Sequence, residues 1–158
     1  MDDSAQKSAA GSFPPLNLPP APLVRRGEEV LCWARRRYVR LEPEEWVRQH
    51  WLAYLGALGY PRGGMSVEHV LSLHGQSLRA DLVCHDRQGR PRLLAEFKAP
   101  DVRLNQAVVD QTLTYNLTLR APIVLISNGI QHHAYSVPAE DPSGGMATVL
   151  AGIPAFVE

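Results

Sequence analysis

Lysine, cysteine, long apolar runs and net charge are all scarce in this chain of 158 residues. The two cysteines, Cys32 and Cys84, lie far apart, which excludes a disulfide framework and a zinc finger and predicts small buried side chains in a reducing cytoplasm. No apolar run approaches the roughly 18 residues that span a bilayer, so a membrane protein is excluded. The polar N-terminus, Met1 to Lys7, predicts no secretory signal.

Charge is balanced and unevenly composed. Sixteen basic and sixteen acidic residues give zero formal charge, so the overall charge favours neither a nucleic-acid-binding tail nor an acidic one. All but two of the basic residues are arginines, and the two lysines are Lys7 and Lys98. Because Lys7 lies in a segment predicted to be disordered, Lys98 is the only lysine expected in the fold. An ammonium group has a tunable pKa that a guanidinium lacks, which favours a specific role for Lys98.

The length and the 45% apolar content predict one compact α/β domain. Proline-rich residues 1–24 are predicted to form a disordered arm. A folded domain follows at 25–137, with a pair of strands within 29–41 and a core over 43–137, and residues 138–158 form a C-terminal extension.

Hydrophobic periodicity predicts the core elements in the order α-β-β-β-α-β-β. The helices are expected at 43–58 and 105–119, and the strands at 66–73, 80–85, 92–98, 123–127 and 132–137. Asn128-Gly129 predicts a two-residue turn between the last two strands. The segment TVLAG in the C-terminal extension predicts one more short strand.

The second and third core strands are expected to form a hairpin that brings two acids together. A two-residue turn at Gln88-Gly89 pairs residues whose numbers sum to 177, so Asp81 would face Glu96 with Cβ atoms about 5 Å apart. Lys98 follows Glu96 by two positions and therefore shares its face of the strand. A bulge near the turn would shift this register by one residue.

Two carboxylates directly opposite each other repel, so this arrangement needs something that offsets the repulsion. A divalent cation with oxygen ligands does so, and Mg²⁺ is usually held by one or two carboxylates, waters and substrate phosphate. Lys98 would then position a water that attacks phosphorus. The alternative interpretation is that Lys98 bridges Asp81 and Glu96 as a surface ion pair, worth about 0–1 kcal/mol.

These residues resemble a known nuclease motif. The resemblance is to the PD-(D/E)XK nuclease superfamily, with Ala80 in place of the motif's proline, and its elements are Asp81-(x14)-Glu96-Phe97-Lys98, a preceding helix with Glu44 and a following helix with Gln111-x-x-x-Tyr115. The wider context is similar to the N-terminal nuclease domain of type I restriction enzyme R subunits. The stretches that carry this similarity lie within residues 41–129 and are LEPEEWVRQHWLAYLGALGYP, LRADLVCHDRQGRPRLLAEFKAPDV, DQTLTYN and IVLISNG.

The resemblance implies a restriction-endonuclease-like core (α-β-β-β-α-β), with a four-stranded mixed central sheet flanked by helices. It also implies an endonuclease that hydrolyses DNA phosphodiester bonds with Mg²⁺ or Mn²⁺. The metal ligands would be Asp81, Glu96 and the main-chain carbonyl of Phe97, with Glu44 contributing directly or through water, and Lys98 would serve the attacking water.

The helix that follows the hairpin is expected to assist at the substrate. Gln111 and Tyr115 lie four residues apart on one face and, by the resemblance, would hydrogen-bond the DNA phosphate or orient Lys98. The alternative is a half-buried tyrosine beside a solvated glutamine. Arg79 precedes Asp81 by two positions, so it is expected to point the same way and either contact phosphate or screen the acids.

Helical geometry distinguishes the two neighbouring acids Glu44 and Glu45. At 100° per residue, Glu44 lies about 40° from the centre of the apolar stripe, whereas Glu45 lies about 140° away, toward solvent. Glu44 also precedes Arg48 by four residues, a favourable spacing for an ion pair. We therefore expect Glu44 to join the site, and the alternative is that both are ordinary acids of a first helical turn.

Other charged residues have weaker functional interpretations. Arg35-Arg36-Arg37 favours a solvated turn over a nucleic-acid grip, and Glu68 is either a further acid near the site or an edge-strand charge. A non-catalytic module of the same fold, binding nucleic acid or a protein partner, is the alternative to the nuclease, and zero net charge favours it. A homodimer or another subunit would then supply additional contact with DNA.

Overall fold

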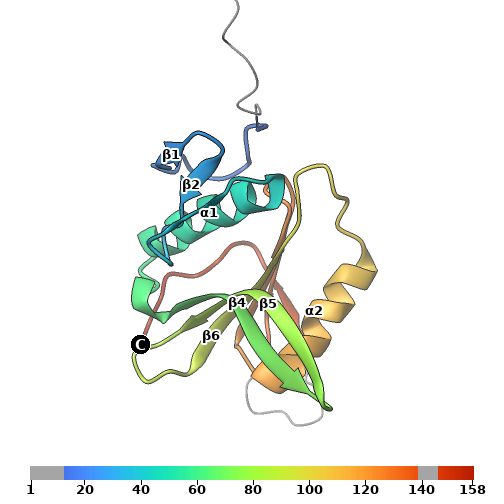
Figure 1. Ribbon diagram of the computed structural model, residues 1–158. Helices are drawn as coiled ribbons and strands as arrows, with labels where there is room; N and C mark the ends of the chain where they lie inside the picture. The colour runs from blue at the N-terminus through green and yellow to red at the C-terminus, as the bar shows by residue number, and fades with distance from the viewer. Residues whose placement is uncertain (1–12, 139–145) are drawn as a thin grey trace, which may run out of the picture.

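A six-stranded mixed sheet forms the centre of the computed structural model, which describes residues 13–138 and 146–158 (Figure 1). The strand order is β4-β5-β6-β7-β8-β9. β6 and β7 are parallel and the other neighbours are antiparallel. The strands are β4 (Met65–Leu73), β5 (Gln76–His85), β6 (Pro91–Phe97), β7 (Ile123–Ser127), β8 (His132–Ser136) and β9 (Thr148–Leu150). The mixed α/β class is as expected, but the sheet is wider than four strands because β8 and β9 extend it.

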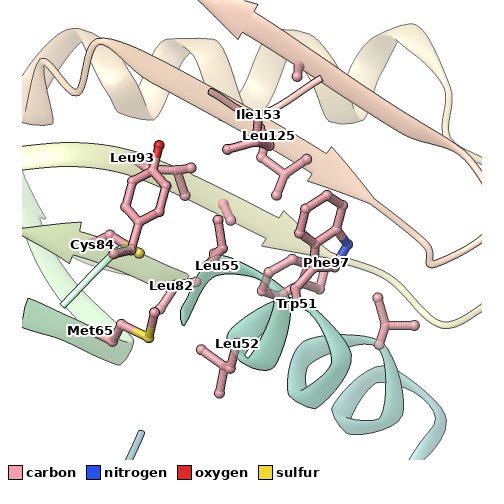
Figure 2. Packing of buried hydrophobic residues seen from close by; sticks show 14 of the residues in the cluster. Trp51, Leu52, Leu55, Met65, Leu82, Cys84, Leu93, Phe97, Leu125 and Ile153 are labelled. Carbon is pink, nitrogen blue, oxygen red and sulfur yellow. The ribbon is translucent and has the colours of Figure 1, made fainter. Parts of the chain in front are cut away.

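Helix α1 (Pro43–Ala57) covers one face of this sheet. It begins where the sequence predicts, with proline in its first turn, and its stripe of Val47, Trp51 and Leu55 is buried. Figure 2 shows Trp51 and Leu55 beside Phe97 and strand residues of β5 to β7. Both cysteines of the sequence are free and buried, as expected for small apolar side chains.

Helix α2 (Gln106–Leu119) connects β6 to β7 and lies on the opposite face of the sheet (Figure 1). Asn105 caps it by accepting a hydrogen bond from the Val108 main-chain nitrogen at 3.0 Å. Val109 of α2 packs with Val124 and Ile126 of β7, whose side chains alternate with the α1-facing Leu125. The crossover helix therefore places its residues above the face that α1 does not cover.

A small three-stranded sheet covers a second side of α1. Its strands are β1 (Arg25–Arg26), β2 (Glu29–Leu31) and β3 (Tyr38–Arg40), in the order β1-β2-β3. The loop between β2 and β3 contacts the helix directly, because the Trp33 main-chain nitrogen donates to Oε1 of Gln49 at 2.9 Å. Helix α1 is thus packed between two layers, whereas the sequence pattern predicts one.

The chain before β1 is a strap across the end of α1, here defined as residues 13–18. Pro14 accepts a hydrogen bond from Nε1 of Trp46 at 3.0 Å, and the Asn17 main-chain nitrogen donates to the Gly129 carbonyl at 2.8 Å. Leu16 lies so close to Gly129 that a Cβ there would stand 2.7 Å from its methyl carbon. The predicted disorder of residues 1–24 does not describe this part, and residues 1–12 lie outside the described ranges.

The C-terminal extension also contacts the body. β9 pairs with β8, and the Phe156 main-chain nitrogen donates to the Leu58 carbonyl at 2.9 Å. The short strand predicted in TVLAG is therefore present at Thr148–Leu150. Residues 139–145 lie outside the described ranges. Across 13–138 and 146–158, no helix has the length and apolar character needed to cross a bilayer.

The β5–β6 hairpin keeps the predicted register through a different turn. Leu82 pairs with Ala95 and Val83 with Leu94, as expected, but His85 pairs with Pro91 across a bulge. The turn is not the expected two-residue turn at Gln88-Gly89. It is closed instead by a hydrogen bond that the Asp86 main-chain nitrogen donates to the Arg90 carbonyl at 2.9 Å. The bulge absorbs the extra residue, so the register beyond it is preserved.

The β7–β8 connection also differs from its prediction. Ser127 pairs with His132, so four residues form the loop rather than the two-residue turn expected at Asn128-Gly129. The Asn128 side chain accepts hydrogen bonds from the main-chain nitrogens of Ile130 at 2.9 Å and Gln131 at 2.7 Å. Such a side-chain-to-backbone turn replaces the tighter one.

Candidate active site

Asp81 and Glu96 lie next to each other on neighbouring strands. The pairing of Leu82 with Ala95 carries the register to this position, and side-chain alternation places both acids on the face of Val83 and Leu94. Oδ2 of Asp81 accepts a hydrogen bond from the Phe97 main-chain nitrogen at 2.7 Å. The two carboxyl groups are close enough to share a hydrogen bond when one of them holds a proton.

Burial and mutual repulsion change the acidity of this pair. Burial raises the pKa of Glu96 to about 8, and the neighbouring Asp81 carboxylate contributes to the rise. Burial likewise raises the pKa of Asp81, although the Phe97 N–H donor and the positive charges of Arg48 and Lys98 act in the opposite direction. At neutral pH the pair therefore resists carrying two negative charges, which is the electrostatic state that a cation would relieve.

Lys98 directly follows β6 and places its side chain beside Glu96. Its Nζ lies 3.6 Å from Oε1 of Glu96, and its side chain is about one-third exposed. The Lys98 main-chain nitrogen donates to the Ser127 carbonyl at 2.9 Å, which fixes the end of β6 against β7. The ammonium group is thus held beside the acid pair yet remains open to solvent.

Glu44 reaches toward the pair from the first turn of α1. Burial raises the pKa of Glu44, and the nearby Asp81 raises it further, whereas Arg48 and Lys98 lower it. Its carboxylate lies 3.6 Å from Nη2 of Arg48, the ion pair that the spacing of four residues predicts. Its side chain is 44% exposed, so it can move toward a ligand.

The solvent-facing position predicted for Glu45 is wrong. Glu45 is buried: its Oε1 accepts from Nε2 of Gln49 at 2.7 Å and lies 3.4 Å from Nη2 of Arg35, while its Oε2 lies 3.3 Å from Nη1 of Arg48. The stripe calculation assumes one packing face, but the small sheet, with the loop between β2 and β3, covers this side of the helix. Glu45 therefore has a buried, ion-paired environment distinct from that of Glu44.

Sequence reasoning missed a cluster of arginines beside the acids. Arg35, expected in a solvated turn, has a side chain only 19% exposed and contacts Glu45 and Glu68. Arg48 is also buried, and its charge lowers the pKa of Asp81. The spacing from Glu44 to Arg48 was the available signal for Arg48, whereas the contacts of Arg35 depend on long-range packing.

Gln111 and Tyr115 lie on α2, above the face that carries the acids. Nε2 of Gln111 donates to the Tyr115 hydroxyl at 2.8 Å, so the two side chains form one unit. Tyr115 packs against the apolar cluster that contains Val83 and Leu94. In the described part of the chain, neither side chain hydrogen-bonds Asp81, Glu96 or Lys98, so their predicted assistance stays a prediction.

Arg79 contacts Glu68 rather than the acid pair. Its Nη1 lies 3.8 Å from Oε2 of Glu68, and its side chain is 65% exposed. The structure therefore brings together Asp81, Glu96, Lys98 and Glu44, and keeps Arg79 in the adjacent arginine cluster.

The donor set suits a hard divalent cation, although it is not a closed cage. Across residues 13–138 and 146–158, no group of three His, Cys, Asp or Glu side chains is arranged to hold a metal ion. Two close carboxylates with raised pKa values and a main-chain carbonyl at Phe97 are oxygen donors of the kind that Mg²⁺ uses together with water and substrate.

Comparison with known families identifies the part of the chain that contains these residues. The family described as type I restriction enzyme R protein N terminus matches residues 43–154, which include both helices, the six-stranded sheet and every residue of the site. No curated protein matches the sequence.

Proposed function

Because the chain belongs to the family of type I restriction enzyme R protein N-terminal domains, we propose that it hydrolyses DNA phosphodiester bonds with Mg²⁺ or Mn²⁺ on a restriction-endonuclease-like core. The observation that carries the proposal is the half-buried pair of Asp81 and Glu96, in which burial, together with mutual repulsion, raises the pKa of Glu96 to about 8 beside the only lysine in the described residues. Such a pair destabilises a purely structural strand pair and is stabilised by a cation. We place this activity in the cytoplasm, where the family's DNA substrate would be found.

The cation would be held by Asp81, Glu96 and the main-chain carbonyl of Phe97, with Glu44 contributing directly or through water. When bound, it would supply positive charge that offsets the two carboxylates and stabilises negative charge on the phosphate. The partial exposure of Glu44, with its raised pKa, supports this accessory role.

Lys98 would orient the attacking water and stabilise the charge that develops on the phosphate. The main chain of Lys98 is held by its hydrogen bond to the Ser127 carbonyl, while the side chain remains partly accessible to solvent. An arginine would present a larger planar group with no accessible neutral form, which supports the choice of lysine at this position.

Gln111 and Tyr115 would bind a phosphate oxygen next to the reacting one. Since Gln111 donates to the tyrosine oxygen, the proton of the Tyr115 hydroxyl is free to donate to an anion. Arg79 would contact the DNA backbone through its exposed guanidinium group.

The test is cleavage of supercoiled, linear, single-stranded and branched DNA by the purified protein with Mg²⁺ or Mn²⁺. Asp81→Asn and Lys98→Ala should abolish cleavage while the protein stays folded. Glu158→Gln is the matched control, because it removes an exposed carboxylate that pairs with Arg87 away from the site. Retention of full cleavage by the Lys98 variant would disprove the mechanism.

A non-catalytic DNA- or partner-binding module is the second candidate. The balanced charge of the chain favours it, because a domain that grips DNA unaided often carries a basic excess. It predicts Mg²⁺ binding by calorimetry without cleavage of any DNA form. A homodimer or another subunit would then supply the remaining DNA contacts, and light scattering with and without DNA tests for the homodimer.

A further inference from the structure

Glu68 has an unusual backbone conformation beside the acid pair. The pairs Val67–Leu82 and His69–Ala80 flank it, so it stands opposite Asp81 on the neighbouring strand. Its φ of 54° lies in the left-handed region, which residues other than glycine seldom adopt within a strand. Such a conformation persists when the surrounding structure imposes it.

Three guanidinium groups surround the Glu68 carboxylate. Its Oε2 lies 3.5 Å from Nη1 of Arg35 and 3.8 Å from Nη1 of Arg79, and its Oε1 lies 3.8 Å from Nη1 of Arg48. All three distances exceed the roughly 2.7–2.9 Å of a charge-assisted hydrogen bond. With the Glu68 side chain 41% exposed, these contacts are ionic attractions that another anion can replace.

The three arginines differ in what they would lose if Glu68 left. Arg35 and Arg48 both contact a second acid, Glu45, at 3.4 Å and 3.3 Å. Arg79 has no other acid within 4.0 Å among residues 13–138 and 146–158, and it is the most exposed of the three. Removing Glu68 would therefore leave Arg35 and Arg48 ion-paired with Glu45 and would free Arg79 alone.

We infer that Glu68 occupies, in the free protein, the place at Arg79 that a DNA phosphate takes in the complex. Glu68 is thus an internal competitor, and DNA binds only by displacing it from Arg79. A phosphate matches the negative charge of Glu68 and presents two oxygens to the guanidinium fork. The site adjoins the acid pair, because Glu68 stands opposite Asp81 and Arg48 lowers the pKa of Asp81. The inference rests on the proposed function in taking DNA as the ligand.

A double-mutant cycle on DNA binding tests this competition. Binding of a short fluorescent duplex is measured by anisotropy in chelator, so that no hydrolysis occurs. Glu68→Gln should tighten binding roughly three- to tenfold, because Arg79 is released. Arg79→Gln should weaken binding, and in that background Glu68→Gln should change it less than about twofold.

An exposed ion pair elsewhere supplies the matched control. Arg87 and Glu158 lie 3.2 Å apart with side chains 74% and 43% exposed, so Arg87→Gln and Glu158→Gln make the same charge changes. In a double-mutant cycle on DNA binding, these two substitutions should show no coupling with each other. Where Glu68→Gln fails to fold, Glu68→Asn replaces it, because asparagine tolerates a left-handed conformation.

Three outcomes would overturn the inference. Equal tightening by Glu68→Gln with and without Arg79 would indicate general charge repulsion. Unchanged DNA binding by Glu68→Gln would exclude competition. The absence of duplex binding by every variant would exclude it as well. The outcome is separable from the nuclease proposal. Cleavage by the wild type without coupling removes this inference alone, whereas coupling without cleavage in Mg²⁺ keeps it and removes the nuclease.

Discussion

At the closed end of the β5–β6 hairpin, Asp86 accepts hydrogen bonds from the main-chain nitrogens of Gln88 at 3.0 Å and Arg90 at 2.9 Å, and from Nε of Arg90 at 2.8 Å. At the open end, Asp81 accepts one such bond and lies against a second acid, Glu96. The two ends of one hairpin therefore hold carboxylates in opposite electrostatic environments, with Asp86 buried and Asp81 and Glu96 half-buried.

The pKa shifts at the two ends reflect this contrast. Burial alone would raise the pKa of Asp86, but the main-chain and side-chain donors of Arg90 outweigh it and lower the pKa. For Asp81 and Glu96 burial dominates, and their mutual repulsion adds to it for Glu96, so both pKa values rise. A carboxylate with all its donors supplied within the fold stabilises a turn, whereas a pair without them is suited to an external cation.

Activity is expected to give the largest difference between the two ends. Asp81→Asn and Lys98→Ala should each lower the rate of Mg²⁺-dependent DNA cleavage by about 100-fold or more, because they remove the proposed metal ligand and the group proposed to orient the attacking water. Asp86→Asn should leave the rate per folded molecule within about twofold. Plasmid nicking measures all three, and comparable losses at both ends would remove the functional distinction.

The pH dependence of stability should have opposite signs at the two ends. The raised pKa of Glu96 means that the folded state keeps a proton that the unfolded chain releases between pH 4.5 and about 8. Stability without divalent cations should therefore fall as the pH rises through this window. Glu96→Gln should remove the fall and add on the order of a few kcal/mol at pH 8. Urea unfolding at several pH values measures this, and a wild type that gains stability across the window would contradict it.

Addition of Mg²⁺ should sharpen the contrast further. At pH 8, a cation that binds only the folded state should raise the melting temperature of the wild type by about 5–10 °C at a hundredfold excess over its dissociation constant. Glu96→Gln should abolish most of that gain, and Asp86→Asn should keep it. Thermal unfolding with and without chelator measures the shift, and an equal gain in both variants would place the cation elsewhere.

The smallest effect is expected from the closed end itself. The lowered pKa of Asp86 gives stability that is present above the ordinary value of 3.8 and is lost as the pH falls through the folded-state pKa. Asp86→Asn should therefore lower the melting temperature at pH 7 and have little effect in strong acid. Asp101→Asn removes an exposed carboxylate as a control and should change neither value.

The fold could be predicted where local signals agree. Pro43 and the stripe through Val47, Trp51 and Leu55 define α1, and strand alternation places Asp81 opposite Glu96. The predicted register of the hairpin is correct although the predicted turn is wrong, because the bulge at His85 compensates for the different turn length. Strand alternation, together with the approximate position of the turn, therefore carried enough information to bring the two acids together.

The rest of the site depends on packing that sequence spacing does not encode. The burial of Glu45 requires the small sheet, which adds a second covered side to α1 that a one-stripe calculation cannot include. The left-handed conformation of Glu68 has no signal in the local sequence, and its contact with Arg35 joins residues far apart in the chain. Such contacts become visible only when the tertiary structure is known.

The strap gives the beginning of the described chain a structural importance that its proline-rich composition conceals. Leu16 fills the space beside Gly129 and Val47. Gly129 lies in the loop that follows Ser127, and the Ser127 carbonyl accepts the hydrogen bond from the Lys98 main-chain nitrogen. A shortened protein starting after residue 18 would therefore uncover an apolar opening two residues from the anchor of its lysine. Trimming this end to improve crystals or yield would therefore alter the surroundings of Lys98.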